Sequence, residues 1–376
     1  MVTPITDVAD LRRHLQWAIE VEHATIPPYE YAMWSVVDPD SAAATSIKYV
    51  AREEMLHAAL AANLLTAVGG SPRFTAGSVP RYPGPMPHHS PAEPLILHLA
   101  PASLELVRDV FLRIEQPEAP GSQPEADRYE TLAQFYEAIA DAMALLGDEV
   151  FSGDPHRQVT RGYAGHGGGA LFAVTDLDTA LLAIEEIVEQ GEGTHTSAVS
   201  PVGFAPDRLA HLEIEPFGFE GAPERAHYWR FLDIVEGRTP IDVHRMRVDP
   251  SSGELPEGEL RDLCRLFDAC YSLQLEVMER VWRSGDESPL IEGAMVPLMN
   301  HAEKPIALAL VREPWPGGSG DVAGPPFAWD PMPLEDIREQ ARRLASTFDL
   351  GPTVETLDQV AAIAGGGAWP AEPSLR

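Results

Sequence analysis

Residues 47–64 read IKYVAREEMLHAALAANL, and this stretch decides the fold. Its apolar residues recur at three- and four-residue steps, which predicts one buried face of an α-helix. That face consists of Ile47, Val50, Glu54, His57, Ala61 and Leu64. A carboxylate and an imidazole within an apolar face are costly unless they are paired or bind a metal. Glu54 and His57 are therefore candidate metal ligands.

The Glu-x-x-His spacing has a physical basis, because residues three apart share a helix face. Four of the 13 histidines follow a glutamate by three residues: His23, His57, His195 and His227. His57 and His227 continue apolar faces of their helices. The His23 pair lies away from the apolar face of its helix, and Gly193 interrupts the His195 pair.

The spacing of single glutamates extends this set. Glu22 precedes Glu54 by 32 residues, and Glu192 precedes Glu224 by the same number. Carboxylate bundles with two iron or manganese ions take one Glu from each of two helices and one Glu-x-x-His from each of two others. The predicted metal ligands are Glu22, Glu54, His57, Glu192, Glu224 and His227.

These oxygen and nitrogen ligands suit two iron ions, with manganese as the alternative. Glu137 and Glu189 are substitutes should one of the six not bind metal, and His195 is a candidate seventh ligand.

Helical patterns dominate the whole chain, and strand-like alternation is sparse, which predicts an all-α fold. Pro27-Pro28 should kink or divide the first helix. The expected helices cover residues 6–37, 41–68, 102–114, 126–150, 176–191, 223–236, 257–283, 292–311 and 334–348.

The order of these helices predicts two parts. Residues 1–240 would form a four-helix metal-binding bundle, with a long crossover insertion at 70–176. Residues 241–376 would form a helical C-terminal extension packed on the bundle.

The excess of acidic residues argues against some classes of partner. Lys and Arg number 27 against 58 Asp and Glu, giving a net charge of −31, which argues against nucleic-acid and membrane-surface partners. Cys264 and Cys270 are expected to be small apolar residues rather than a disulfide. Because we find neither a leader sequence nor a membrane span, we expect a cytoplasmic protein. A homodimer is compatible with this interpretation.

The same residues carry a family resemblance. Residues 15–29 (LQWAIEVEHATIPPY), the Glu-Glu-Met-x-His motif at 53–57, the Phe-Tyr-x-x-Ile segment at 135–139, the Gln-Gly-Glu-Gly turn at 190–193 and residues 226–231 (AHYWRF) resemble the iminophenyl-pyruvate dimer synthase family. The resemblance spans roughly residues 8–236. It implies a ferritin-like fold, a non-haem metal centre and a place in bacterial secondary metabolism. Founding members of that family oxidatively couple two amino-acid-derived imines in bisindole pathways.

Three functions remain open. The first is a di-iron oxidase or oxygenase that uses dioxygen on a small amino-acid-derived molecule, including oxidative imine coupling, with Tyr31, Tyr136 and Tyr228 as candidate pocket residues. The second is a ferritin-like protein that stores or detoxifies iron without an organic substrate. The third is a scaffold with a structural metal. About half of the chain lies outside the bundle, which favours the enzyme.

Overall fold

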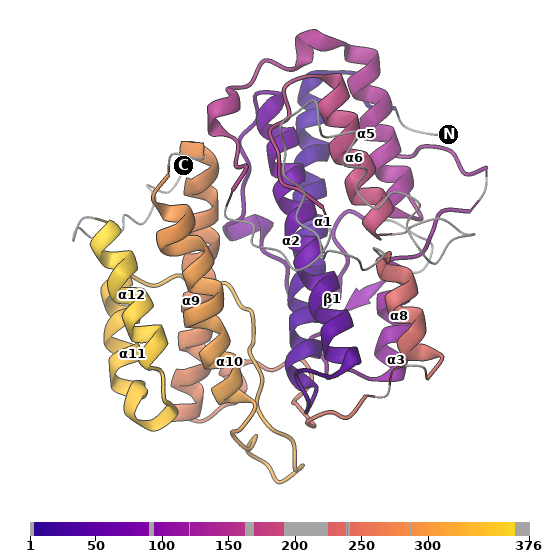
Figure 1. Ribbon diagram of the computed structural model, residues 1–376. Helices are drawn as coiled ribbons and strands as arrows, with labels where there is room; N and C mark the ends of the chain where they lie inside the picture. The colour runs from indigo at the N-terminus through magenta and orange to yellow at the C-terminus, as the bar shows by residue number, and fades with distance from the viewer. Residues whose placement is uncertain are drawn as a thin grey trace.

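A computed structural model of the chain describes residues 4–89, 94–119, 121–161, 169–191, 225–237, 239, 241–285 and 288–364. Two long helices, α1 (Val8–Ser35) and α2 (Ala42–Ala67), form the centre of the molecule (Figure 1). They run antiparallel, because the Arg12 side chain near the start of α1 donates to the Val68 carbonyl just after α2. The Asp7 and Ser41 side chains cap the N-termini of α1 and α2. Each accepts a hydrogen bond from a backbone N–H group in the first turn of its helix, which stabilises that turn.

Helix α1 passes through Pro27 and Pro28 without being divided, so the expected division of this helix is wrong. Proline has no N–H and leaves the carbonyl four residues earlier without its helical partner. For Pro28 that carbonyl belongs to Ala24, and the Tyr82 hydroxyl donates to it over 2.7 Å. The side chain thus replaces the missing backbone hydrogen bond.

Shorter elements follow α2. The first group comprises η1 (Ala76–Ser78), β1 (Gly84–Pro85), β2 (Ile96–Leu97), α3 (Leu104–Leu106), the π-helical turn η2 (Val107–Phe111) and α4 (Leu112–Ile114). The strands β1 and β2 pair antiparallel. The second group comprises α5 (Leu132–Leu146), η3 (Asp148–Val150), η4 (Pro155–Arg157), α6 (Leu177–Gly191) and α8 (His227–Val235).

These elements complete the bundle in two halves. Helices α5 and α6 pack together, α5 on α1 and α6 on α2, whereas α8 packs on α2, η2 and α4. Figure 1 shows α5 and α6 toward one end of the α1–α2 pair, and α3 and α8 toward the other. Helix α6 therefore ends, and α8 begins, beside the middle of the long helices.

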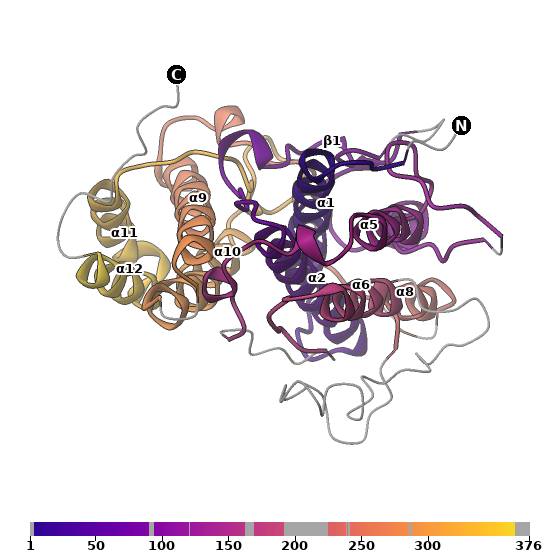
Figure 2. The ribbon, with the colours of Figure 1, turned by 90° about the horizontal axis from the view of Figure 1, so that it is seen from above.

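The rest of the chain covers the opposite side of α1 and α2, as Figure 2 shows for α9 and α10. Its elements are η6 (Ser252–Glu254), α9 (Glu259–Ser284), the π-helical turns η8 (Ile291–Met295) and η9 (Leu298–Glu303), α10 (Lys304–Leu310), α11 (Leu334–Phe348) and α12 (Gly351–Ile363). The buried Trp282 indole donates to Asn63 of α2 over 3.0 Å. One hydrophobic cluster extends from Leu15 through α9 to Val360. The division of the chain into a bundle and a C-terminal extension at residue 240 stays a prediction.

The all-α prediction is confirmed, but two details differ. Helix α12 was not among the expected helices; its Pro352 lies in the first turn, where proline is tolerated. The helix expected at 126–150 begins only after Thr131, whose side chain caps α5. Among the described helices, none is long and apolar enough to cross a membrane.

Candidate metal centre

Two groups of buried acidic and histidine side chains meet between the two halves of the bundle. One contains Glu22, Glu54 and His57, and the other contains Glu54, Glu115 and His227; within each group, potential ligand atoms lie within 4.8 Å of one another. Glu54 belongs to both groups. All five side chains are at most 1% exposed, so the site is shielded from solvent.

Two histidines approach Glu54: His57 lies three residues after it on α2, and His227 is the first residue of α8. The Nδ1 atom of His57 lies 3.6 Å from Oε1 of Glu54 and 3.7 Å from Oε2 of Glu22. The Nδ1 atom of His227 lies 3.0 Å from the same Glu54 oxygen and 3.3 Å from Oε2 of Glu115. Both imidazoles thus direct Nδ1 at the carboxylates.

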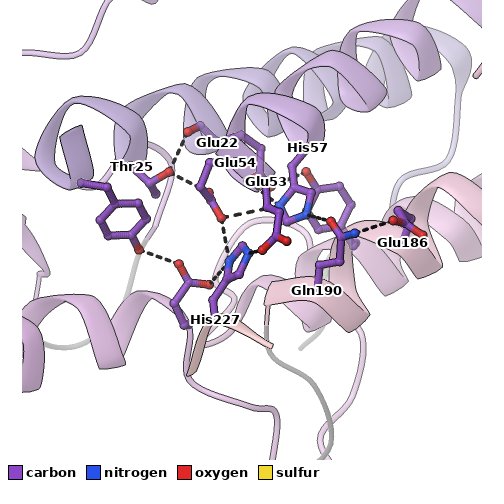
Figure 3. A network of polar contacts seen from close by, with 11 residues as sticks. Glu22, Thr25, Glu53, Glu54, His57, Glu186, Gln190 and His227 are labelled. Carbon is purple, nitrogen blue, oxygen red and sulfur yellow. Dashed lines mark hydrogen bonds and ion pairs between the residues drawn. The ribbon is translucent and has the colours of Figure 1, made fainter. Parts of the chain in front are cut away.

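The outer nitrogen of each ring contacts an acceptor (Figure 3). Nε2 of His57 lies 2.9 Å from Oε1 of Gln190, and the Gln190 amide in turn donates to Glu186. Nε2 of His227 lies 2.9 Å from Oε2 of Glu53. An acceptor at Nε2 holds a proton there, so loss of the other proton to a metal would leave the Nδ1 lone pair facing the centre.

Hydroxyl groups fix the carboxylates. Tyr136 donates to Oε1 of Glu22 over 2.6 Å, and Thr25 donates to Oε2 of Glu54 over 2.7 Å. Tyr29 donates to Oε1 of Glu115 over 2.5 Å. Each carboxylate therefore retains one oxygen that faces the histidines.

The shifts in pKa show that the buried carboxylates of the cluster favour a positive charge beside them. Burial and the neighbouring Glu54 raise the pKa of Glu22 to about 7. Burial opposes the charge on Glu54, but the nearby imidazoles of His227 and His57 outweigh it and hold its pKa below the ordinary value. Burial opposes the charge on His57 too, yet the nearby Glu22 and Glu54 carboxylates raise its pKa to about 10. In the protein alone, protons on the imidazoles supply the positive charge.

A pair of metal ions fits these residues. Oε2 of Glu22 is buried and has no hydrogen-bond partner, and a buried polar atom of this kind calls for a ligand. The set of carboxylates and imidazoles matches the oxygen and nitrogen donors that iron and manganese accept. The cluster is thus compatible with a two-metal site in which Glu54 is shared.

The structure brings together four of the six predicted ligands: Glu22, Glu54, His57 and His227. The other two, Glu192 and Glu224, and the candidate His195 lie outside the described residues. Neither Glu137, which is exposed, nor Glu189, which is half-buried, belongs to either group.

Of the three candidate pocket tyrosines, Tyr136 touches the cluster. Tyr31 points elsewhere, and its hydroxyl donates to the Arg247 carbonyl. It follows Glu22 by nine residues, or about two and a half helical turns, and so lies on the opposite face of α1. Tyr228 is half-buried and packs edge-on against Trp229. Tyr31 and Tyr228 thus do not contact the cluster, and their role as pocket residues stays a prediction.

Glu115 is the residue that sequence reasoning missed. The predicted helix ended one residue before it, at Ile114, and Glu115 is the C-cap of α4. Val107 and Phe111, both fully buried, precede it at four-residue steps. A carboxylate that continues an apolar face is the signal that identified Glu54, so the same test could have found Glu115.

The fold and the site define a helical-bundle protein with a buried carboxylate–histidine cluster. The chain belongs to the ferritin-like family, whose model matches residues 15–236. A crystal structure of a ferritin-like protein from Caulobacter vibrioides superposes with a TM-score of 0.59, at 24% identity over 79% of this chain and 94% of that one. This likeness supports the ferritin-like fold.

A characterised relative is dichlorochromopyrrolate synthase from Lentzea aerocolonigenes. It is 25% identical to this chain over a match that covers 91% of the chain and 38% of the synthase. The chain thus spans well under half the length of that relative. The chain is therefore similar to part of a biosynthetic enzyme. The reaction named for the whole synthase is a statement about that protein.

Proposed function

We propose that this protein is a non-haem two-metal oxidase or oxygenase that acts on a small amino-acid-derived molecule in secondary metabolism. The observation that carries the proposal is Glu54, whose Oε1 lies between the Nδ1 atoms of two histidines in a fully buried cluster. Iron is the metal we propose, with manganese as the alternative.

One ion would be held by Glu22, Glu54 and His57, and the other by Glu54, Glu115 and His227. When bound, a pair of such ions supplies the electrons and the open coordination positions needed for dioxygen chemistry. The protein's own part is to hold the ligands in position and to exclude water, which strengthens electrostatic interactions.

Two hydroxyl groups control protons at the cluster. Burial and the adjacent Glu22 raise the pKa of Tyr136, so it keeps its proton and donates to Glu22. Burial and Glu115 likewise raise the pKa of Tyr29, which donates to Glu115. Each tyrosine thus holds one oxygen of its carboxylate, Glu22 or Glu115, and leaves the other oxygen for a metal.

Two further lines support an oxidative biosynthetic role. The relative from Lentzea aerocolonigenes is named as a synthase of dichlorochromopyrrolate. The family resemblance of residues 8–236 implies coupling of imines derived from amino acids. The proposed partners are accordingly a small organic substrate and dioxygen.

Dioxygen uptake tests the proposal. Protein loaded anaerobically with ferrous iron is mixed with dioxygen, with and without imines generated from L-phenylalanine or L-tryptophan by an amino-acid oxidase. Uptake coupled to a new organic product supports the enzyme. Uptake without any substrate, together with many ferric ions retained per chain, contradicts it and favours iron storage.

A further inference from the structure

A second site lies across the α1–α2 pair from the metal cluster. A cavity of about 360 Å³ opens between these helices and α9, η8 and η9, on the side where Figure 2 shows α9 and α10. Its volume falls in the range of small-molecule sites. None of the five clustered side chains of the candidate metal centre lines it.

The walls of this cavity are mostly apolar. They include the side chains of Ile26, Met55, Leu275, Met278, Trp282 and Met295. Methionine adapts its shape to an irregular ligand, and Trp282 provides an aromatic surface. The body of a ligand for this cavity would therefore be hydrocarbon or aromatic.

Two buried acceptor oxygens at the wall have no hydrogen-bond partner. They are Oε1 of Glu303, on a side chain 4% exposed, and Oε1 of Gln274, on a side chain 8% exposed. By contrast, the neighbouring Tyr271 hydroxyl and Nε2 of His23 lie 2.7 Å apart and satisfy each other. An unpaired buried acceptor is unfavourable, and both unpaired atoms are acceptors. A ligand that satisfies these two oxygens must therefore carry a hydrogen-bond donor.

The charges around the cavity favour a cationic donor. Burial and the nearby Glu30 carboxyl raise the pKa of Glu303 well above its ordinary value. Arg52 offsets the charge of Glu30, and Arg161 pairs with Glu292 at 3.1 Å. A positively charged donor beside Glu303 would favour the ionised form of its carboxyl group.

A metal ion fits this cavity poorly. Among the described residues, no group of three ligating side chains gathers at the cavity, and oxygen-binding metals require more ligands than Glu303 and Gln274 provide. An organic cation with one nitrogen and an apolar body matches both features of the wall.

We propose that this cavity binds an apolar small molecule carrying a protonated amine, with the amine between Glu303 and Gln274. The site is separate from the metal cluster and does not depend on the proposed oxidase activity. A carboxylate in the position of the amine would instead face the two acceptor oxygens, Oε1 of Glu303 and Oε1 of Gln274.

The test uses three probes that share a phenylethyl body: 2-phenylethylamine, 2-phenylethanol and 3-phenylpropanoate. Isothermal titration calorimetry on the full chain, with and without bound metal, measures each affinity. We expect the amine to bind about tenfold or more tightly than the alcohol, and the acid not to bind. An amine that binds no tighter than the alcohol, or a measurable preference for the acid, overturns the proposal.

Variants locate the binding. Glu303→Gln should weaken amine binding by about tenfold and leave the alcohol unchanged, whereas Glu339→Gln, at an exposed carboxylate of α11, should alter neither. Val296→Phe should block both probes by filling the cavity while the melting temperature and metal content are retained.

A further variant covers the case in which Glu303→Gln does not fold. Gln274→Leu removes the other acceptor and should weaken the amine several-fold. Amine binding that survives unchanged in Gln274→Leu or in Val296→Phe contradicts the assignment.

Discussion

The Nδ1 atom of His227 lies 3.0 Å from Oε1 of Glu54, which joins the first turn of α8 to the middle of α2. His57 approaches the same oxygen from within α2, at 3.6 Å. One carboxylate oxygen therefore faces two imidazoles whose outer nitrogens are held by Gln190 and Glu53. This shared position of Glu54 determines how metal binding should respond to substitution.

Glu54→Ala should lose both metals, because both groups depend on this side chain. Glu22→Ala and Glu115→Ala should each retain about one metal per chain, since each removes a ligand of one group only. Metal content after anaerobic iron loading, measured by inductively coupled plasma mass spectrometry alongside circular dichroism, checks this. His244→Ala, at an exposed position, should match the parent protein, and two irons in Glu54→Ala would rule out the shared carboxylate.

Gln190→Leu should weaken metal binding without removing a ligand. The amide orients His57 through Nε2, and loss of such outer contacts lowers metal affinity about 10- to 100-fold. Competition with a chelator of known affinity measures the change. Gln359→Leu, at an exposed glutamine of α12, is the control. Equal affinities in the two variants would show that Gln190 does not orient His57.

Tyr82→Phe should lower the free energy of unfolding by about 1 kcal/mol, because it leaves the Ala24 carbonyl beside Pro28 without its donor. Urea denaturation of the two proteins provides the comparison. Metal content should be unaffected. An unchanged midpoint would mean that this carbonyl finds another donor, such as water.

Glu30→Gln should flatten the dependence of the melting temperature on pH. Burial raises the pKa of Glu30 from 4.5 to about 8, against the opposing charge of Arg52. The folded state thus binds this proton more tightly than the unfolded state, so the stabilisation is complete below pH 4.5 and is lost as the pH rises toward 8. The melting temperature of the parent protein should fall more steeply across this window than that of Glu30→Gln.

This comparison is made on metal-free protein, so that metal release does not contribute. Glu339→Gln should follow the parent profile. A Glu30→Gln profile parallel to that of the parent would show that Glu30 titrates alike in the folded and unfolded chain.

Much of the fold could be predicted because helical periodicity is a local property. The apolar faces of α1 and α2 are continuous, and Glu22, Glu54 and His57 lie on them at helical spacing. The undivided α1 could not be foreseen, because the donor to the Ala24 carbonyl comes from Tyr82, far along the chain.

The candidate site, too, could be predicted only in part from the sequence. The apolar face of Val107 and Phe111 marks Glu115 as a candidate ligand, but its contact with His227 depends on the packing of η2 and α4 against α8. The repeated 32-residue step favoured Glu192 and Glu224 instead. Equal spacing along the chain describes connection lengths, whereas ligation depends on which helix ends meet in space.

Anomalous diffraction from a crystal of the iron-loaded protein tests the central claim most directly. The account predicts two iron peaks, one among Glu22, Glu54 and His57 and the other among Glu54, Glu115 and His227. A crystal with full iron loading and no anomalous peak beside Glu54 would contradict it.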